Sequence, residues 1–196
     1  MSSFNKMIIV YIHGASATID SFNYIRDHLP YKDYAISYDS ANGFENNLQD
    51  MLKQLEGFED IFFIAHSLGG IYSLHIANAM PNSVLGAVTL STPYGGSETA
   101  DYAKYFLPFS RLLRDIGPSS WPIRQADNIT IQHPWCNIVT VKGASPWMTE
   151  PNDGIVTIKS QKHHSENMEL VEVDSNHYEV VINERVINLI KERLPQ

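Results

Sequence analysis

The sequence predicts an α/β fold in which a mostly parallel sheet of about six strands carries helices on both faces. Short apolar runs of strand length recur along the chain, and most are followed by a segment with helical spacing. These runs are apolar throughout instead of alternating, which is typical of parallel strands buried on both faces. At 196 residues the chain is long enough for one substantial core and short for two ordinary domains, so we expect a single domain over 1–196.

The elements follow from where each pattern starts and stops. Met7 to Ile12 form the first apolar run, and Pro30 helps to end the helix that comes after it. Apolar side chains recur at helical spacing between residues 44 and 56, so that one stripe would cover the sheet. By the same criteria we expect strands over residues 7–12, 34–38, 61–65, 84–90, 137–141 and 168–173. We expect helices over residues 20–29, 44–56, 71–79, 155–162 and 178–194.

Composition and charge argue against several classes of protein. An apolar fraction of 43% with 18% charged residues is typical of a folded globular chain. A net charge of −8 without a cluster of Lys and Arg argues against a nucleic-acid partner. No apolar stretch approaches the roughly 18–20 residues of a transmembrane segment. Cys136 is the single cysteine, and with no signal peptide at the N-terminus we expect a cytoplasmic location.

The stretch Ala65-His66-Ser67-Leu68-Gly69-Gly70 joins a strand-like run to a helical run and has the pattern of a nucleophile elbow. A serine on such a sharp turn exposes its hydroxyl, and strand and helix then approach so closely that only small side chains fit two positions away. Gly69 meets this requirement, whereas Ala65 replaces the usual first glycine with one extra methyl group. A serine near glycines can equally be a helix N-cap, so the elbow needs support from the rest of the chain.

Four groups able to take part in catalysis, Ser67 among them, follow strands of the predicted sheet. His13-Gly14 follows the first strand, Ser67 follows the third, Asp153 lies in the loop after the fifth, and His177 follows the sixth. Catalytic groups of open α/β sheets collect at the carboxyl ends of the strands. We therefore expect these residues to share one rim of the sheet although they are distant in sequence.

Together these residues resemble those of the α/β-hydrolases, in particular the compact bacterial lipases and esterases. The family's order of serine, aspartate and histidine is kept by Ser67, Asp153 and His177. The resemblance covers essentially the whole chain, and it implies a serine carboxylic-ester hydrolase that uses an acyl-enzyme and no cofactor. It rests on His13-Gly14, Ala65-His66-Ser67-Leu68-Gly69-Gly70, Ser91-Thr92-Pro93-Tyr94-Gly95-Gly96-Ser97, Asn152-Asp153-Gly154-Ile155-Val156 and His177.

Three side chains would divide the chemistry between them. The Ser67 hydroxyl is a weak nucleophile at neutral pH and needs a base, for which His177 is the histidine placed to serve. Asp153 would orient that ring and stabilise its charged form. Asp174 and Glu150 compete for this role, but Asp174 lies so close to His177 in sequence that the far ring nitrogen is awkward to reach. Glu150 lies in the right loop, but Asp153, followed by glycine and an apolar pair, matches the family better.

The developing oxyanion would be bound by backbone donors. The N–H groups of Leu68 and Ala15 are the expected pair, since they directly follow the nucleophile and the His13-Gly14 pair. The positive end of the helix that begins behind Ser67 would add to them. His13 itself either ties down its loop or contacts the substrate.

Residues 95–136 interrupt the alternation of strands and helices with a segment too apolar for an ordinary surface loop. This segment predicts either a small helical cap over a substrate pocket or extra core packed against the sheet. A cap of this composition would favour a small-molecule ester with an apolar acyl group. Residues expected to contact that substrate are His13, Tyr94, Phe106, Phe109 and Trp121.

The remaining histidines have simpler interpretations. The side chain of His66 is expected to point away from the apex of the elbow, and His28 and His75 fit helix surfaces. The pair His163-His164 suggests metal binding, but no third ligand lies at a suggestive spacing. We therefore expect a solvated helix end and no metal at this position.

Other functions remain compatible with the same residues. A thioesterase or an amidase would use the same three side chains. A non-catalytic binding protein could keep the fold and hold a small ligand at the rim, although that role does not need Ser67, Asp153 and His177 jointly. A dehalogenase or epoxide hydrolase of this fold would carry an aspartate at the elbow, where this chain has serine.

Overall fold

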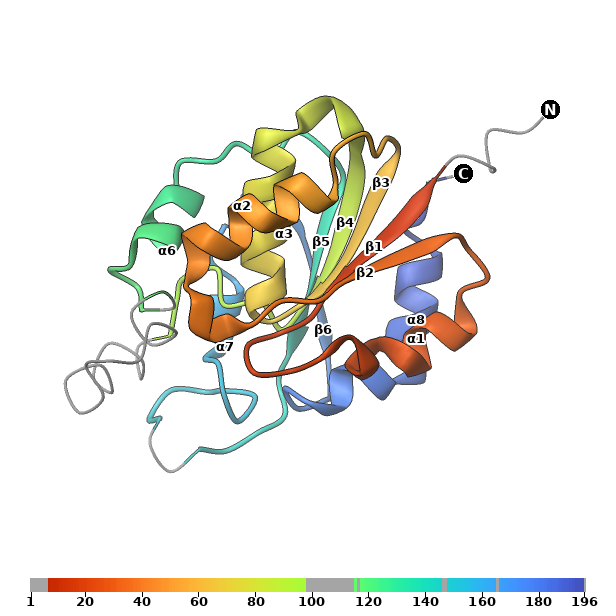
Figure 1. The fold of residues 1–196 in the computed structure, drawn as a ribbon. Helices are drawn as coiled ribbons and strands as arrows, with labels where there is room; N and C mark the ends of the chain where they lie inside the picture. The colour runs from red at the N-terminus through yellow and green to blue at the C-terminus, as the bar shows by residue number, and fades with distance from the viewer. Residues whose placement is uncertain (1–6, 98–114, 116, 146–147, 165, 196) are drawn as a thin grey trace.

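A six-stranded sheet forms the centre of the structure, a computed structural model that describes residues 7–97, 115, 117–145, 148–164 and 166–195. The strand order is β2-β1-β3-β4-β5-β6, and every neighbouring pair is parallel (Figure 1). The strands are β1 (Ile8–Ile12), β2 (Asp33–Ile36), β3 (Ile61–His66), β4 (Val84–Leu90), β5 (Trp135–Thr140) and β6 (Glu169–Val173). The predicted α/β fold with a six-stranded parallel sheet is confirmed.

Helices cover both faces of this sheet. Helices α2, α3 and α6 pack on one face, and α1 and α8 pack on the other (Figure 1). The α-helices are α1 (Asn23–His28), α2 (Phe44–Gln54), α3 (Leu68–Ala79), α6 (Trp121–Ala126), α7 (Ile158–Gln161) and α8 (Glu184–Lys191). The 3₁₀ helices are η2 (Ile19–Phe22), η3 (Ser40–Asn42), η4 (Pro81–Ser83) and η5 (Glu179–Ile182).

Strand β1 shows why the strands read as continuous apolar runs. Each of its residues is buried, because side chains that alternate along a strand meet a layer of helices on either face. Ile8, Val10 and Ile12 join the apolar cluster under α2 and α3. Ile9 and Tyr11 join the cluster under α1 and α8. The sheet is therefore the middle of three layers, and its strand ends are held rigidly.

Helix α3 is the most enclosed helix among the described residues. Ten of its twelve residues are buried, so the helix is apolar on nearly every side. Its N-terminus begins directly at the end of the central strand β3. A helix enclosed in this way cannot shift without disturbing its neighbours, which fixes the turn from which it starts.

Several predicted helices are shorter or divided in the structure, and the helix expected over residues 20–29 is divided into η2 and α1. The expected helix over residues 178–194 is divided into η5 and α8, because the side chain of Asn183 caps α8 by accepting a hydrogen bond from the Arg185 N–H. The expected helix over 155–162 begins only at Ile158, since Asn152 and Thr157 first pair in an isolated antiparallel bridge. In contrast, α3 starts at Leu68, earlier than the expected residue 71.

Much of the predicted cap, including Phe106 and Phe109, lies outside the described residues. The described part of 95–136 contains α6, which packs against α3 through a hydrogen bond between His75 Nε2 and the Pro122 carbonyl oxygen at 2.9 Å. In the parts of the chain that the structure describes, no helix combines the length and apolar character needed to cross a membrane.

Candidate active site

Ser67 occupies the turn between β3 and α3 in a strained backbone conformation. Its φ of 53° and ψ of −123° lie outside the regions that a serine ordinarily adopts. The turn is tight enough that a Cβ on Gly69 would lie 2.1 Å from the Ile12 carbonyl oxygen. A Cβ on Gly70 would lie 2.0 Å from Thr92 Oγ1. Only glycine fits at either position, as the close approach of strand and helix at an elbow requires.

His177, in the loop after the last strand of the sheet, contacts this serine. It follows β6, and its Nε2 lies 3.1 Å from Ser67 Oγ. Its Nδ1 lies 2.8 Å from Asp153 Oδ2, and its backbone N–H donates to the Asp153 carbonyl oxygen at 3.1 Å. Since the aspartate accepts at Nδ1, this nitrogen carries the proton and Nε2 is left as the acceptor for the serine hydroxyl.

Asp153 is held by donors on both of its oxygens. Oδ1 accepts the backbone N–H groups of Ile155 at 3.0 Å and Val156 at 2.8 Å. Oδ2 accepts Thr140 Oγ1 at 2.6 Å and Gln161 Nε2 at 3.2 Å, in addition to His177. The side chain of Asp153 is fully buried, so these donors replace the water that it loses.

The balance of these effects keeps Asp153 ionised. Burial works to raise its pKa, but hydrogen bonds from His177, Thr140 and the Val156 N–H outweigh burial and hold the pKa below its usual value. A permanently charged acceptor then fixes the tautomer of His177. The two competing acids lie elsewhere: Asp174 is exposed, and Glu150 Oε1 faces Lys159 Nζ at 3.7 Å.

A cleft opens above Ser67 and His177 and encloses about 240 Å³. Most of its lining is apolar, and Ile155 and Tyr178 on its edge are exposed by 40% and 68%. The lining residues are Gly14, Ala15, Ala17, Ser21, His66, Ser67, Leu68, Pro93, Ser97, Ile155, Val156, His177, Tyr178 and Val181. An apolar group beside the serine hydroxyl would be well accommodated here.

Both predicted oxyanion donors belong to residues that line this cleft. Leu68 is the first residue of α3, where a backbone N–H has no acceptor within the helix. Ala15 follows Gly14, whose Cβ, if present, would lie 3.1 Å from Ser67 Cβ. The loop is fixed by the Ser16 N–H, which donates to Ser40 Oγ at 3.0 Å. The role of the two N–H groups stays a prediction.

The structure places His13 against the backbone of the loop that carries Gly14 and Ala15, and His13 is not among the residues that line the cleft. Its Nδ1 lies 2.8 Å from the Gly14 carbonyl oxygen, and its ring stacks on Tyr38 with 4.3 Å between centroids. Burial lowers the pKa of His13, so the ring is neutral and able to accept the Tyr38 N–H at 3.4 Å. Of the two predicted roles, this geometry favours tying down the loop.

Two other residues expected to contact substrate also lie away from the cleft. Tyr94 is fully buried, and its hydroxyl meets Thr89 Oγ1 at 3.0 Å and Trp135 Nε1 at 2.7 Å. Trp121 lies on α6, stacked on His75 with 5.8 Å between centroids, and lines a separate surface cleft. His75 is buried beneath it, so the expectation that His75 lies on a helix surface is wrong.

His66 contacts His177, which the sequence does not predict. The sequence predicts a ring that points away from the apex of the elbow. In the structure this ring lies 4.8 Å from the ring of His177, and Nε2 lies 2.9 Å from the His177 carbonyl oxygen. Burial, reinforced by the nearby His177, lowers the pKa of His66 to about 3, so that the ring stays neutral and donates from Nε2. His66 is thus a positioning residue for the backbone of His177.

The fold is the α/β-hydrolase fold, and comparisons with known proteins agree with it. The mature form of the Bacillus licheniformis lipase BlEst2 superimposes with a TM-score of 0.76 at 17% identity, over 96% of this chain and 91% of that one. A triacylglycerol lipase of Pseudarthrobacter phenanthrenivorans is 35% identical over 71 residues, 35% of this chain and 22% of that protein. Triacylglycerol lipase 2 of Saccharomyces cerevisiae is 27% identical over 155 residues, 62% of this chain.

These likenesses differ in how much of each protein they cover. The chain spans 22% and 47% of the length of the two curated lipases, whereas it spans most of the mature BlEst2 structure. No protein-family model matches the sequence. The similarity to the solved structure is therefore one of fold.

Proposed function

We propose that this protein is a serine carboxylic-ester hydrolase that acts through an acyl-enzyme on esters with an apolar acyl group. One observation carries the proposal: Ser67 Oγ, His177 and Asp153 form a continuous chain of contacts of 3.1 and 2.8 Å. Asp153 is ionised and buried, so the histidine presents its unprotonated nitrogen to the serine hydroxyl. The similarity to lipases adds independent support.

The first half of the reaction acylates the serine. Ser67 Oγ attacks the ester carbonyl carbon while its proton passes to His177 Nε2, and the carbonyl oxygen becomes an oxyanion held by the Ala15 and Leu68 N–H groups. Collapse of this tetrahedral species breaks the bond to the alcohol oxygen. That oxygen takes the proton from His177 Nε2 and leaves as the alcohol.

The second half returns the enzyme to its starting state. Water attacks the acyl carbon of the Ser67 ester, and His177 Nε2 accepts a proton from it. Collapse releases the carboxylic acid, and the proton returns to Ser67 Oγ. Asp153 stabilises the imidazolium in both halves without taking a proton itself.

The cleft supports the preference for an apolar acyl group. Its volume of about 240 Å³ suits a short to medium chain, and Val156, Tyr178 and Val181 give it apolar walls. A cytoplasmic location and the absence of a nucleic-acid partner stay predictions.

Substitution of the nucleophile tests the proposal. We expect Ser67→Ala to abolish hydrolysis of p-nitrophenyl esters of short and medium chain length, with an unchanged circular dichroism spectrum. A fluorophosphonate probe should label the folded wild-type protein on Ser67, as located by mass spectrometry. Ser37→Ala, which changes an exposed serine outside the cleft lining, is the matched control and should retain turnover and labelling.

Equal turnover in Ser67→Ala and wild type, or no labelling of the folded protein, would overturn the proposal and favour a binding function. Acyl-CoA and amide substrates in the same assay separate an esterase from a thioesterase or an amidase. We expect the oxygen esters to have the highest kcat/KM.

A further inference from the structure

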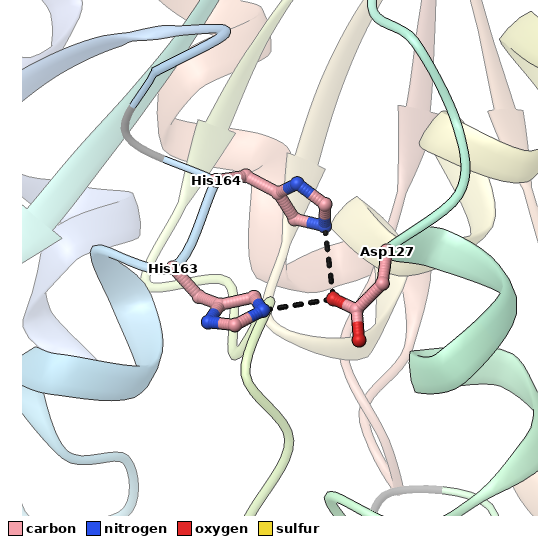
Figure 2. A group of neighbouring side chains, drawn as sticks. All are labelled: Asp127, His163 and His164. Carbon is pink, nitrogen blue, oxygen red and sulfur yellow. Dashed lines mark hydrogen bonds and ion pairs between the residues drawn. The ribbon is translucent and has the colours of Figure 1, made fainter.

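A second cluster of ionisable side chains lies outside the cleft just described. It joins Asp127, which follows α6, to His163 and His164, which follow α7 (Figure 2). Asp127 Oδ1 lies 2.8 Å from His163 Nε2 and 3.4 Å from His164 Nε2. The three potential ligand atoms lie within 4.8 Å of one another. Both rings direct Nε2 at the same carboxylate oxygen (Figure 2).

The His164 ring is buried, and its Nε2 therefore needs a bonding partner. Its side chain is 8% exposed, and the edge of the ring packs against Tyr94 with 5.9 Å between centroids. Within the described residues, His164 Nε2 forms no hydrogen bond, although Asp127 Oδ1 lies 3.4 Å away. A buried nitrogen without a bonding partner is costly, and a bound cation would satisfy it.

The backbone holds the two adjacent rings in this orientation. His164 has a φ of +57°, an uncommon value for a histidine. Side chains of neighbouring residues normally diverge, but the left-handed residue turns the chain so that both rings reach Asp127. The structure thus keeps a strained residue at the point where the two imidazoles meet.

We propose that Asp127, His163 and His164 form a binding site for a divalent cation of the Zn²⁺ type, with water as the fourth ligand. Zinc ligands at about 2.0–2.1 Å in tetrahedral geometry lie roughly 3.4 Å apart. The separation of His164 Nε2 from Asp127 Oδ1 already matches this value. The separation of the two Nε2 atoms is bounded only by the 4.8 Å that spans all three ligand atoms, so the His163 ring needs to move away from Asp127 Oδ1 and towards His164 by up to about 1.4 Å. Its side chain is 48% exposed and therefore able to move.

The donor set indicates which cation the site would take. Two imidazole nitrogens and one carboxylate favour Zn²⁺ over Mg²⁺ or Ca²⁺, which prefer oxygen ligands. Asp127 is 45% exposed, so the site is open on one side for entry of the ion and for a water ligand. A protein of net charge −8 also attracts cations to its surface.

A bound ion would join two parts of the fold that are distant in sequence. Asp127 and His163 are separated by 36 residues and are contributed by the ends of two different helices. Because binding requires the folded arrangement of these ends, the ion is expected to stabilise the folded state.

Metal titration of the tag-free full chain tests the proposal. After removal of metal with EDTA and exchange into chelator-free buffer, isothermal titration calorimetry with ZnCl₂ should give one saturable site. Co²⁺, used as a spectroscopic probe, should produce visible absorption bands typical of four-coordinate cobalt with nitrogen and oxygen ligands. Zn²⁺ should also raise the thermal melting temperature.

Variants separate this site from adventitious binding. Asp127→Asn and His163→Gln should lose the saturable binding and the cobalt bands while keeping the circular dichroism spectrum of the metal-free protein. His28→Gln, which changes an exposed histidine elsewhere on the surface, should bind as wild type does. Wild-type binding no stronger than that of His163→Gln, or binding lost equally in His28→Gln, would overturn the proposal.

Discussion

His177 and His163 each place a ring nitrogen 2.8 Å from an aspartate oxygen, His177 on Asp153 and His163 on Asp127. The side chains of the first pair are 4% and 0% exposed, and those of the second are 48% and 45% exposed. The same contact therefore occurs once in the interior and once at the surface. What differs is the set of further partners that each aspartate has.

This difference decides what each pair can do. Asp153 accepts several other hydrogen bonds, so it cannot turn away from His177, and the ring is held with Nε2 on Ser67. Asp127 can turn in solvent and is shared between two imidazoles. Breaking a buried pair leaves an uncompensated charge, at a cost of about 3–5 kcal/mol, whereas an exposed pair contributes about 0–1 kcal/mol. Distance alone does not distinguish a catalytic pair from a surface pair.

We expect the largest effect from a substitution that breaks the buried pair. Asp153→Asn keeps the shape of the side chain but removes the charge that selects the tautomer of His177, so kcat for ester hydrolysis should fall by about 10⁴-fold. Steady-state kinetics with a p-nitrophenyl ester measures this. Asp174→Asn changes an exposed acid on the same loop as His177 and should leave kcat unchanged. Equal losses in the two variants would remove Asp153 from its proposed role.

A smaller effect concerns His66, a histidine that is buried without a carboxylate partner. Its pKa is about 3 in the folded protein, against an ordinary value near 6.5, so between these pH values the unfolded chain binds a proton that the folded chain does not. The free energy of unfolding should therefore fall as pH decreases below about 6.5, with His66 contributing up to about 1.4 kcal/mol per pH unit.

Urea unfolding between pH 4 and pH 7 measures this contribution against His66→Gln, whose amide nitrogen can still donate to the His177 carbonyl oxygen. The variant should lose less stability on acidification than wild type. Parallel pH profiles for the two proteins would show that His66 binds its proton equally in the folded and unfolded states and would contradict the lowered pKa.

The smallest effect concerns the exposed pair. In metal-free protein, Asp127→Asn should change the free energy of unfolding by less than about 1 kcal/mol, because solvent already screens the interaction with His163. Thermal or urea unfolding in EDTA gives this value. A loss of several kcal/mol would mean that this pair behaves like the buried one, and the contrast between the two would not hold.

Much of the framework can be predicted from sequence because burial on both faces leaves an unmistakable pattern. The run from Ile61 to Ala65 and its counterparts define the strands, and parallel strands bring their carboxyl ends to one rim. The sequence alone therefore predicts that Ser67, Asp153 and His177 lie near one another. The distances between these residues and their hydrogen bonds depend on packing and cannot be predicted from the sequence.

The features that the sequence does not predict depend on side-chain direction and on contacts between distant segments. Tyr94 follows the end of β4 closely in the sequence, yet its side chain points into the core. Asp127 lies 36 residues from His163, too far for a spacing pattern to link them. The contact of His66 with the His177 carbonyl likewise depends on how the loop after β6 packs onto the elbow. No local pattern carries this information.

The order of strands along the chain also determines when the contact between Ser67 and His177 can form during synthesis. Ser67 stands on the central strand β3, but the histidine that contacts it lies 110 residues later and arrives with the last strand. Contacts between residues so far apart form late, because closing a long loop precedes the energy gained from it. Recovery of labelling at Ser67 would thus report completion of folding, while spectroscopic signals of helix would return earlier.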